Sequence, residues 1–311
     1  MTKAKVAVIG VGYLGQHHAR VLSQLPNVEL IGVVDIDAAK ASEVAKNYST
    51  NAYADFRDLL DKADAFCIAT PTDTHYSIAV ECMRHNKDLF IEKPIASNTT
   101  EAWEIADTVA KKGLILQVGH IERFNPVFKA ALDIVHTPML IEAERVSPFL
   151  QRAARVDVVK DLMIHDIDLI LALLDAKGIE TDIKSLSAYG LSMVTNKIDL
   201  AYAHIEFALG LKALIKASRI ERDKKRQMTI YEEAGYLRLD FSGHSLRAFV
   251  GEGRTFTEKA IDPTEEPLRL ELMSFVSCVS DRRPPPVSAI DGLKALEVAE
   301  RIIKTIEVVR Q

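Results

Sequence analysis

The side chains best suited to chemistry lie in two short stretches of the chain. Lys93 follows the apolar run 89–91 and Glu92, and ligand-facing side chains gather where buried parallel strands end. Asp161, His165 and Asp168 stand at i, i+4 and i+7, so in a helix they would line one stripe. Lysine and histidine side chains can both exchange a proton with a substrate hydroxyl. The two stretches therefore predict acid–base chemistry.

Each stretch also has a purely structural interpretation. Lys93 could be a surface lysine whose aliphatic stem packs on the edge of a sheet. The segment 160–174 is otherwise apolar, and it could be a core helix with an N-terminal aspartate and a hydrogen-bonded histidine. An unpaired buried charge is costly, so a polar stripe on such a helix needs partners. The residues by themselves leave both interpretations open.

Three glycines near the start of the chain predict a dinucleotide-binding loop. Gly10, Gly12 and Gly15 have the G-x-G-x-x-G spacing after a short β-branched strand. Gly10 permits a tight turn, Gly12 lets a pyrophosphate approach the backbone, and Gly15 lets the next helix pack close to the strand. That helix should begin near Tyr13 and Leu14, with its N–H groups and its positive dipole end toward the phosphates.

A second predicted strand, 30–34, ends at Asp35, whose carboxylate could accept both ribose hydroxyls of an adenosine. The same carboxylate would repel a 2′-phosphate, and no arginine or lysine follows until Lys40. The sequence therefore favours NAD over NADP. The alternative is a glycine-rich turn in an ordinary α/β domain, followed by a helix-capping aspartate.

Strands and helices alternate at short intervals up to residue 120, which is typical of βαβ units and a parallel sheet. One predicted helix covers 76–85, with Asp73 or Thr74 as its cap and Asn86 as a left-handed end. The loops that follow the strands should open on one edge of the sheet: 10–15, 35–37, 70–75, 92–94 and 119–125.

The pattern changes after residue 120. Helices are expected over 127–136, 265–281 and 288–309, and alternating strands over 139–146, 183–191, 200–209, 211–220, 228–232 and 235–241. The alternation predicts an antiparallel sheet with one free face. We therefore expect a Rossmann-like α/β domain over 1–120 that binds NAD. Residues 121–311 should form an α+β domain with a mostly antiparallel open sheet, for substrate binding and oligomerisation.

The composition excludes several classes of protein. The net charge of −5 argues against a nucleic-acid-binding surface spread over the whole molecule. Cys67, Cys82 and Cys278 are widely spaced and form neither a metal-binding pattern nor a disulfide framework, which favours a reducing cytoplasm. The sequence has no recognisable signal peptide and no apolar run long enough to span a bilayer, so no membrane partner is expected.

The motifs together resemble the Gfo/Idh/MocA family of sugar and cyclitol oxidoreductases, and the resemblance covers essentially the whole chain. It implies that Lys93 lies beside the nicotinamide and the reacting hydroxyl, with a proline peptide that is often cis. It implies NAD as the cofactor and no metal. The residues expected to bind NAD are Gly10, Gly12, Tyr13, Leu14, Gly15, Asp35, Thr70, Pro71, His75, Glu92, Lys93 and Pro94.

The polar segment also resembles the family's Asp-x-x-x-His-x-x-Asp helix. This makes His165 the proton acceptor and Asp161 a substrate-holding group, so the expected catalytic residues are these two and Lys93. The sequence departs from the family pattern at Val158-Val159-Lys160, where two glycines are common, and at Met163, where one is usual. These departures leave the loop geometry and the pocket shape open.

Other polar residues are weaker candidates. Arg123 and Asn125, with His120, follow the last parallel strand and could contact the substrate or form a structural turn. Arg152 and Arg155 could meet an anionic substrate. The mixed-sign charge run 219–226 predicts a solvated hairpin, and His17 and His18 are expected to pack within a helix.

Two stretches, 119–126 and 161–168, resemble the branch of the family that oxidises UDP-N-acetylglucosamine at the 3-position. The resemblance implies hydride transfer between a secondary ring alcohol and NAD. The alternatives are an inositol, free-sugar or other nucleotide-sugar dehydrogenase, or a non-catalytic NAD-binding sensor. The expected partners are a sugar or nucleotide sugar and further copies of the chain in a homodimer or homotetramer, without nucleic acid.

Overall fold

The computed structural model describes residues 3–151, 154, 156–250, 255–261 and 266–309. The chain forms two compact units, Met1–Ile121 with Glu265–Lys294, and Glu122–Thr264 with Ala295–Gln311. The sequence predicts a single division after residue 120. In the structure, the segment 265–294 instead belongs to the first unit. The reason is that α7 (Pro267–Asp281) buries Leu272, Phe275 and Val276 in the core of the first unit.

The first unit contains a six-stranded parallel sheet in the order β3-β2-β1-β4-β5-β6. Its central strands are buried on both faces, which explains their nearly continuous apolar sequences. The strands are β1 (Ala4–Ile9), β2 (Val28–Val34), β3 (Ala52–Tyr53), β4 (Ala65–Ile68), β5 (Asp88–Glu92) and β6 (Leu116–Gly119). Because all run in one direction, the loops after them open on one edge, as predicted.

Helices flank this sheet, namely α1 (Gly15–Gln24), α2 (Ala38–Asn47), α3 (Thr72–Arg84), α4 (Thr99–Lys112) and α7, with a 3-10 turn at Phe56–Leu59. Asn86 has the predicted left-handed conformation, φ 55°. The predicted cap of α3 is wrong. The helix begins at Thr72 after Pro71, so Asp73 and Thr74 lie inside its first turn. A proline at this point fixes φ and starts the helix earlier than the side-chain pattern indicates.

The second unit contains a nine-stranded sheet in the order β14-β13-β12-β11-β7-β10-β9-β8-β15. The pairings β7·β10 and β15·β8 are parallel, and the others are antiparallel. The strands are β7 (Leu140–Val146), β8 (Ile183–Leu191), β9 (Leu200–Phe207), β10 (Lys212–Ser218), β11 (Lys225–Glu232), β12 (Gly235–Asp240), β13 (Ser245–Val250), β14 (Thr255–Ala260) and β15 (Glu307–Val309). The predicted combination of a parallel Rossmann-like domain and a mostly antiparallel α+β domain is confirmed.

Three strands of the large sheet, β13, β14 and β15, were not predicted from the sequence, nor was the two-residue strand β3 of the first unit. Every residue of β14 is exposed, so its sequence lacks the alternation that marks a half-buried strand, and β13 pairs with it. The last predicted helix is too long: α8 (Ala289–Thr305) ends before β15, which pairs with β8.

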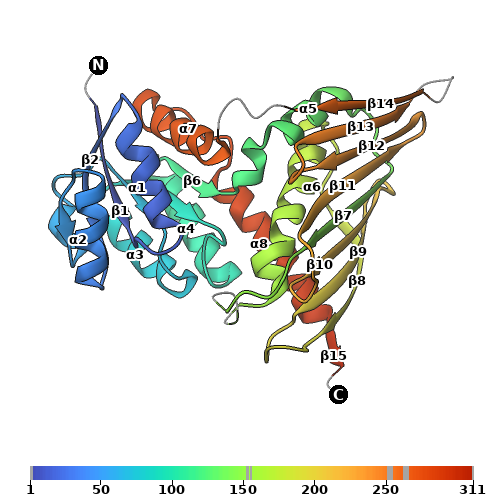
Figure 1. Cartoon of the computed structure of the whole chain (residues 1–311), viewed down its shortest axis with the longest axis horizontal. Coiled ribbons are helices and arrows are strands. Elements are labelled where there is room, and N and C mark those ends of the chain that lie inside the picture. Colours follow the sequence, from blue (N-terminus) through green and yellow to red (C-terminus); the bar gives the residue numbers. More distant parts are fainter. Residues whose placement is uncertain (1–2, 152–153, 155, 251–254, 262–265, 310–311) are drawn as a thin grey trace. The chain divides into compact units, whose positions relative to one another are not determined.

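One face of the large sheet is covered by helices α5 (Pro126–Ile134) and α6 (Ile164–Ala176), as Figure 1 shows. The end of α8 also contributes Ala299 and Ile302 to this apolar core. The opposite face exposes Tyr189, Tyr202 and Leu214. Within the described part of the chain, no helix has both the length and the apolar character to cross a membrane.

Candidate functional site

The glycine loop after β1 leaves one open approach. A Cβ on Gly10, which has φ +83°, would lie 2.8 Å from Thr70 Cγ2, and a Cβ on Gly15 would lie 1.7 Å from the Gly10 oxygen. Both glycines are therefore required for close packing. At Gly12, the nearest described atom to such a Cβ would be Lys40 Nζ, at 4.0 Å. The open side of Gly12 and the N-terminus of α1 suit a pyrophosphate.

Asp35 shapes this loop from the end of β2. Its Oδ2 accepts a hydrogen bond from the Val11 N–H at 2.9 Å, and its Oδ1 accepts one from the Asp37 N–H at 3.0 Å. The neighbouring Ile36 side chain is 98% exposed, a position from which it could pack on an adenine ring. Sequence reasoning missed Ile36 and Lys40, although an apolar residue directly after a strand-end aspartate was an available signal.

Replacing Asp35 and Ile36 should change the cofactor preference. In an Asp35→Ser/Ile36→Arg variant, we expect kcat/KM with NAD to fall by about tenfold to hundredfold, because the hydrogen bonds to a charged acceptor are lost. Activity with NADP should rise, since the new arginine can pair with the 2′-phosphate. Initial rates with each cofactor measure the ratio. An unchanged ratio would contradict the assignment of Asp35 to the ribose.

His75 joins the loops that follow β4 and β5. Its Nδ1 lies 2.9 Å from the Pro94 oxygen and its Nε2 lies 2.9 Å from the Thr70 oxygen. Burial lowers the pKa of His75, although both carbonyl groups oppose the shift. Its described contacts therefore position Thr70 and Pro94, and its direct contact with NAD stays a prediction.

Lys93 is held by a buried polar group beneath the sheet edge. Glu92 Oε2 accepts the Lys93 N–H at 3.2 Å, and Glu92 Oε1 lies 2.8 Å from His18 Nε2. The other ring nitrogen of His18 lies 2.9 Å from Cys67 Sγ. The Lys93–Pro94 peptide is cis. The prediction that His18 merely packs within its helix is wrong, because the partners of this residue come from β4 and β5.

The contact between His18 and Glu92 shifts the pKa values of both residues. Burial disfavours both charges, but Cys67 and Glu92 raise the pKa of His18 well above its usual value. Burial likewise opposes ionisation of Glu92, yet His18 and the neighbouring Lys93 hold the pKa of Glu92 below its usual value. The directions of both pKa shifts favour the ionised pair.

This pair should make stability depend on pH. A raised folded-state pKa of His18 stabilises the fold below about pH 6.5, and this contribution is lost as pH rises through the folded value. The Tm difference between the wild type and a His18→Gln variant should therefore shrink from about pH 6 to about pH 9. His17→Gln, on the same helix, is the matched control. A Tm difference that stays constant with pH would refute the ionised pair.

In the second unit, Asp161 lies in a turn of π-helix, Val159–Met163, that leads into α6. The expected α-helix does not extend over Asp161: this residue lies in the π turn, whereas His165 and Asp168 lie in α6. The alignment of the three side chains stays a prediction. Asp161 and His165 are partly exposed, whereas Asp168 is buried. The two residues predicted to meet substrate are thus the accessible members of the set.

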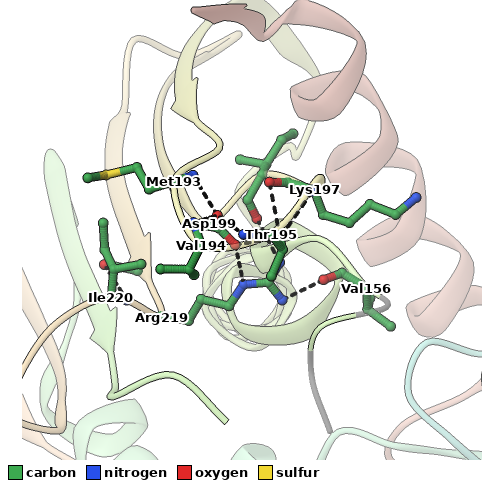
Figure 2. Close-up of polar contacts among 10 residues, drawn as sticks. Val156, Met193, Val194, Thr195, Lys197, Asp199, Arg219 and Ile220 are labelled. Atoms are coloured by element: carbon green, nitrogen blue, oxygen red, sulfur yellow. Dashed lines mark hydrogen bonds and ion pairs between the residues drawn. The ribbon is translucent and has the colours of Figure 1, made fainter. Parts of the chain in front are cut away.

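The chain before the π turn is anchored by a buried ion pair, shown in Figure 2. Arg219 donates from Nε to Asp199 Oδ1 at 2.8 Å and from a terminal nitrogen to the Val156 oxygen at 2.6 Å. The Val158 N–H donates to the Ile198 oxygen at 2.9 Å. Asp157 continues the support, since its carboxylate accepts the Lys160 N–H. These contacts fix the segment that presents Asp161.

The prediction of a solvated hairpin over 219–226 is therefore wrong at both ends. The Arg219 side chain is 2% exposed, and Arg226 is half-buried. Asp199 holds the Arg219 charge and also accepts three backbone N–H groups from its own loop, residues 193–195. Burial opposes the ionisation of Asp199, but these hydrogen bonds and that of the Thr195 hydroxyl hold its pKa far below the usual value.

A second buried network lies behind α6. Arg145 donates to both oxygens of Asp166, at 2.8 and 3.0 Å, and to Glu122 at 2.8 Å. Burial raises the pKa of Asp166 although Arg145 opposes the shift, whereas Arg145 outweighs burial at Glu122 and lowers its pKa. This network fixes α6 against β7.

The structure gives Arg123 and Asn125 structural partners. Arg123 donates to both oxygens of Asp168, at distances of 2.6 to 3.1 Å. Asn125 caps α5 through the Val127 N–H and donates to Glu122. Their contact with substrate stays a prediction. His120 is buried. The structure describes neither Arg152 nor Arg155, so their predicted role lies outside the described residues.

The first unit thus has an arrangement that can bind NAD: an open glycine loop at a helix N-terminus, and an aspartate at the next strand end. Lys93 follows β5 at the same sheet edge. Among the described residues, no group of three or more His, Cys, Asp or Glu side chains could hold a metal ion.

Comparisons with known proteins agree with this arrangement. Residues 4–120 match the Gfo/Idh/MocA family model, described as an oxidoreductase family with an NAD-binding Rossmann fold. UDP-N-acetylglucosamine 3-dehydrogenase of Acidithiobacillus ferrooxidans is 32% identical over 315 aligned residues, covering 99% of this chain and 98% of that protein. Its solved structure has a TM-score of 0.91 at 31% identity, with 99% of each chain covered.

A second relative acts on a polyol. The scyllo-inositol 2-dehydrogenase (NAD(+)) of Bacillus subtilis is 27% identical and covers 95% of this chain and 92% of that protein. The Lactobacillus casei scyllo-inositol dehydrogenase, solved with NAD(H) and scyllo-inositol, shares the fold at 19% identity, with a TM-score of 0.83 and coverage of 98% and 97%. The chain therefore belongs to the Gfo/Idh/MocA family and is an NAD-dependent dehydrogenase that acts on CH–OH groups.

Proposed function

We propose that this protein oxidises the 3-hydroxyl of UDP-N-acetylglucosamine with NAD. The observation that carries the proposal is the full-length similarity to the Acidithiobacillus ferrooxidans enzyme of that activity, at 32% identity. The segments 119–126 and 161–168, which the sequence links to this branch of the family, support it. The inositol dehydrogenases among the relatives make a polyol the alternative substrate.

The proposed reaction removes a proton and a hydride from one secondary alcohol and leaves a ketone. The cofactor accepts the hydride at C4 of its nicotinamide. His165 removes the hydroxyl proton, and Lys93 donates a hydrogen bond to the same oxygen as its C–O bond becomes C=O. Asp161 accepts a hydrogen bond from a neighbouring group of the sugar and so orients the ring.

A substrate panel tests the proposal. The purified protein is incubated with NAD and, separately, with UDP-N-acetylglucosamine, other nucleotide sugars, inositols and free hexoses, while NADH absorbance is followed. We expect NADH only with UDP-N-acetylglucosamine, together with a 3-keto product identified by NMR. Turnover restricted to inositols or free sugars would show that the proposed substrate is wrong. Stabilisation by NAD without turnover on any compound would contradict the proposal and favour an NAD-binding sensor.

We also propose that copies of this chain associate through the outward face of the large sheet. Tyr189, Tyr202 and Leu214 are exposed there beside a hollow of about 640 Å³, and an apolar patch on an open sheet usually meets a partner. Light scattering should give a mass of two or four chains. A concentration-independent mass of 34.5 kDa would contradict this.

The three buried free cysteines support the proposal of a reducing, cytoplasmic compartment.

A further inference from the structure

Arg226 occupies an unusual position on the helix-covered face of the large sheet. It lies directly opposite Arg145 in the antiparallel pairing of β11 with β7. Cross-strand partners project from the same face, and Met228, two residues further along β11, is buried in the core on that face. Like charges placed opposite each other destabilise a sheet, so this pair needs an explanation.

The surrounding carboxylates satisfy one of these two arginines. Arg145 is 2% exposed and takes both oxygens of Asp166 and one oxygen of Glu122. The Arg226 side chain is 37% exposed, and in the described part of the chain its guanidinium makes one hydrogen bond, of 3.4 Å, to the same Glu122 oxygen. Most of the five N–H donors of Arg226 therefore remain available.

Arg226 lies beside the start of α6, because its cross-strand neighbour Arg145 holds Asp166, the residue after His165. Burial and Arg145 lower the pKa of Arg226, while Glu122, Asp166 and Asp161 act electrostatically in the opposite direction. The cluster thus places guanidinium donors beside the segment that carries His165. A sugar that reaches His165 could therefore receive hydrogen bonds from Arg226.

The charge of the cluster indicates which ligand fits. Arg145 and Arg226 contact two carboxylates, those of Glu122 and Asp166, so the cluster has no excess positive charge. A diphosphate would therefore gain little attraction here. A neutral oxygen that accepts from arginine, such as a ring hydroxyl or an N-acyl carbonyl, meets no such penalty.

We propose that Arg226 is a substrate-contacting residue that donates hydrogen bonds to a neutral oxygen of the sugar ring or of its acyl substituent. This assignment rests on the proposed function, because it requires a sugar or polyol substrate. It extends that function by assigning recognition of the ring, and not of the diphosphate, to the start of β11. It also explains why the fold keeps two guanidinium groups side by side.

Arg226→Gln and Arg226→Lys test the assignment. The glutamine variant should fold, because it removes a charge that Arg145 repels. Its KM for the sugar substrate should rise by about tenfold to hundredfold, the effect of losing a hydrogen bond from a charged donor. Arg226→Lys should recover part of the loss. NADH affinity and Tm should remain near wild type. Arg247→Gln, at an exposed position of β13, is the matched control and should leave KM unchanged.

Inhibition by UDP separates ring recognition from phosphate recognition. The inhibition constant of UDP should change less than about twofold in Arg226→Gln, since UDP lacks the N-acetylglucosamine ring. An equal rise in both constants, or an unchanged KM for the sugar, would overturn the proposal. If the wild type oxidises an inositol instead, the proposed substrate is wrong, and the KM for that inositol in Arg226→Gln still decides the role of Arg226.

Discussion

His165→Ala should lower kcat by about 10²–10⁴-fold, the usual contribution of a general base. His165 is partly exposed and is the second residue of α6, which follows the π turn that carries Asp161. Alanine cannot accept the hydroxyl proton, so the alcohol would have to ionise without a base. The loss should appear in kcat more than in KM, because the base acts mainly in the transition state.

Three controls make this prediction specific. NADH affinity should stay near wild type, since the residues expected to hold the cofactor lie in the first unit. His204→Ala, which changes an exposed histidine of β9, should retain full activity. Added imidazole should restore part of the His165→Ala rate by acting as a diffusible base. A His165→Ala enzyme with near-normal kcat on its true substrate would show that His165 is not the general base.

Lys93→Met should reduce kcat by about 10²–10³-fold, comparable to removing one donor to a reacting oxygen. The backbone of Lys93 is fixed by Glu92, which itself is held by His18. Methionine keeps the length of the side chain, so the variant removes the N–H donors while disturbing packing little. Steady-state kinetics with saturating NAD would measure the effect.

Comparison with other variants tests whether Lys93 and His165 act on one step. Lys111→Met, at an exposed position of α4, should behave as wild type. The double variant of Lys93 and His165 should be far less than multiplicatively impaired, because residues that act as a unit lose their effects together. Fully multiplicative losses would indicate that they act on separate steps.

The sequence by itself determined the parts of the site that depend on local backbone geometry. Gly10 and Gly15 were identified because a positive φ and close packing exclude other side chains. The strand-end positions of Asp35 and Lys93 followed from apolar runs that only a buried strand explains. Alternating sequences likewise predicted most strands of the large sheet, including the bounds of β8.

The burial and the partners of several charged residues were determined by the tertiary structure alone. Arg219 appeared solvated in sequence because desolvating a charge is costly, yet Asp199, twenty residues away, removes that cost. The same holds for Arg145, whose carboxylate partners come from two other segments, and for His18 with Glu92.

The π turn and the addition of α7 to the first unit also depend on packing. Neither has a local signature: a π turn uses the same residue types as an α turn, and an apolar helix face does not specify which core it joins. Local sequence therefore fixed which backbone segments carry Lys93, Asp161 and His165. Long-range pairing of buried charges decided how those segments are held, because such pairing is favourable only where both partners leave water together.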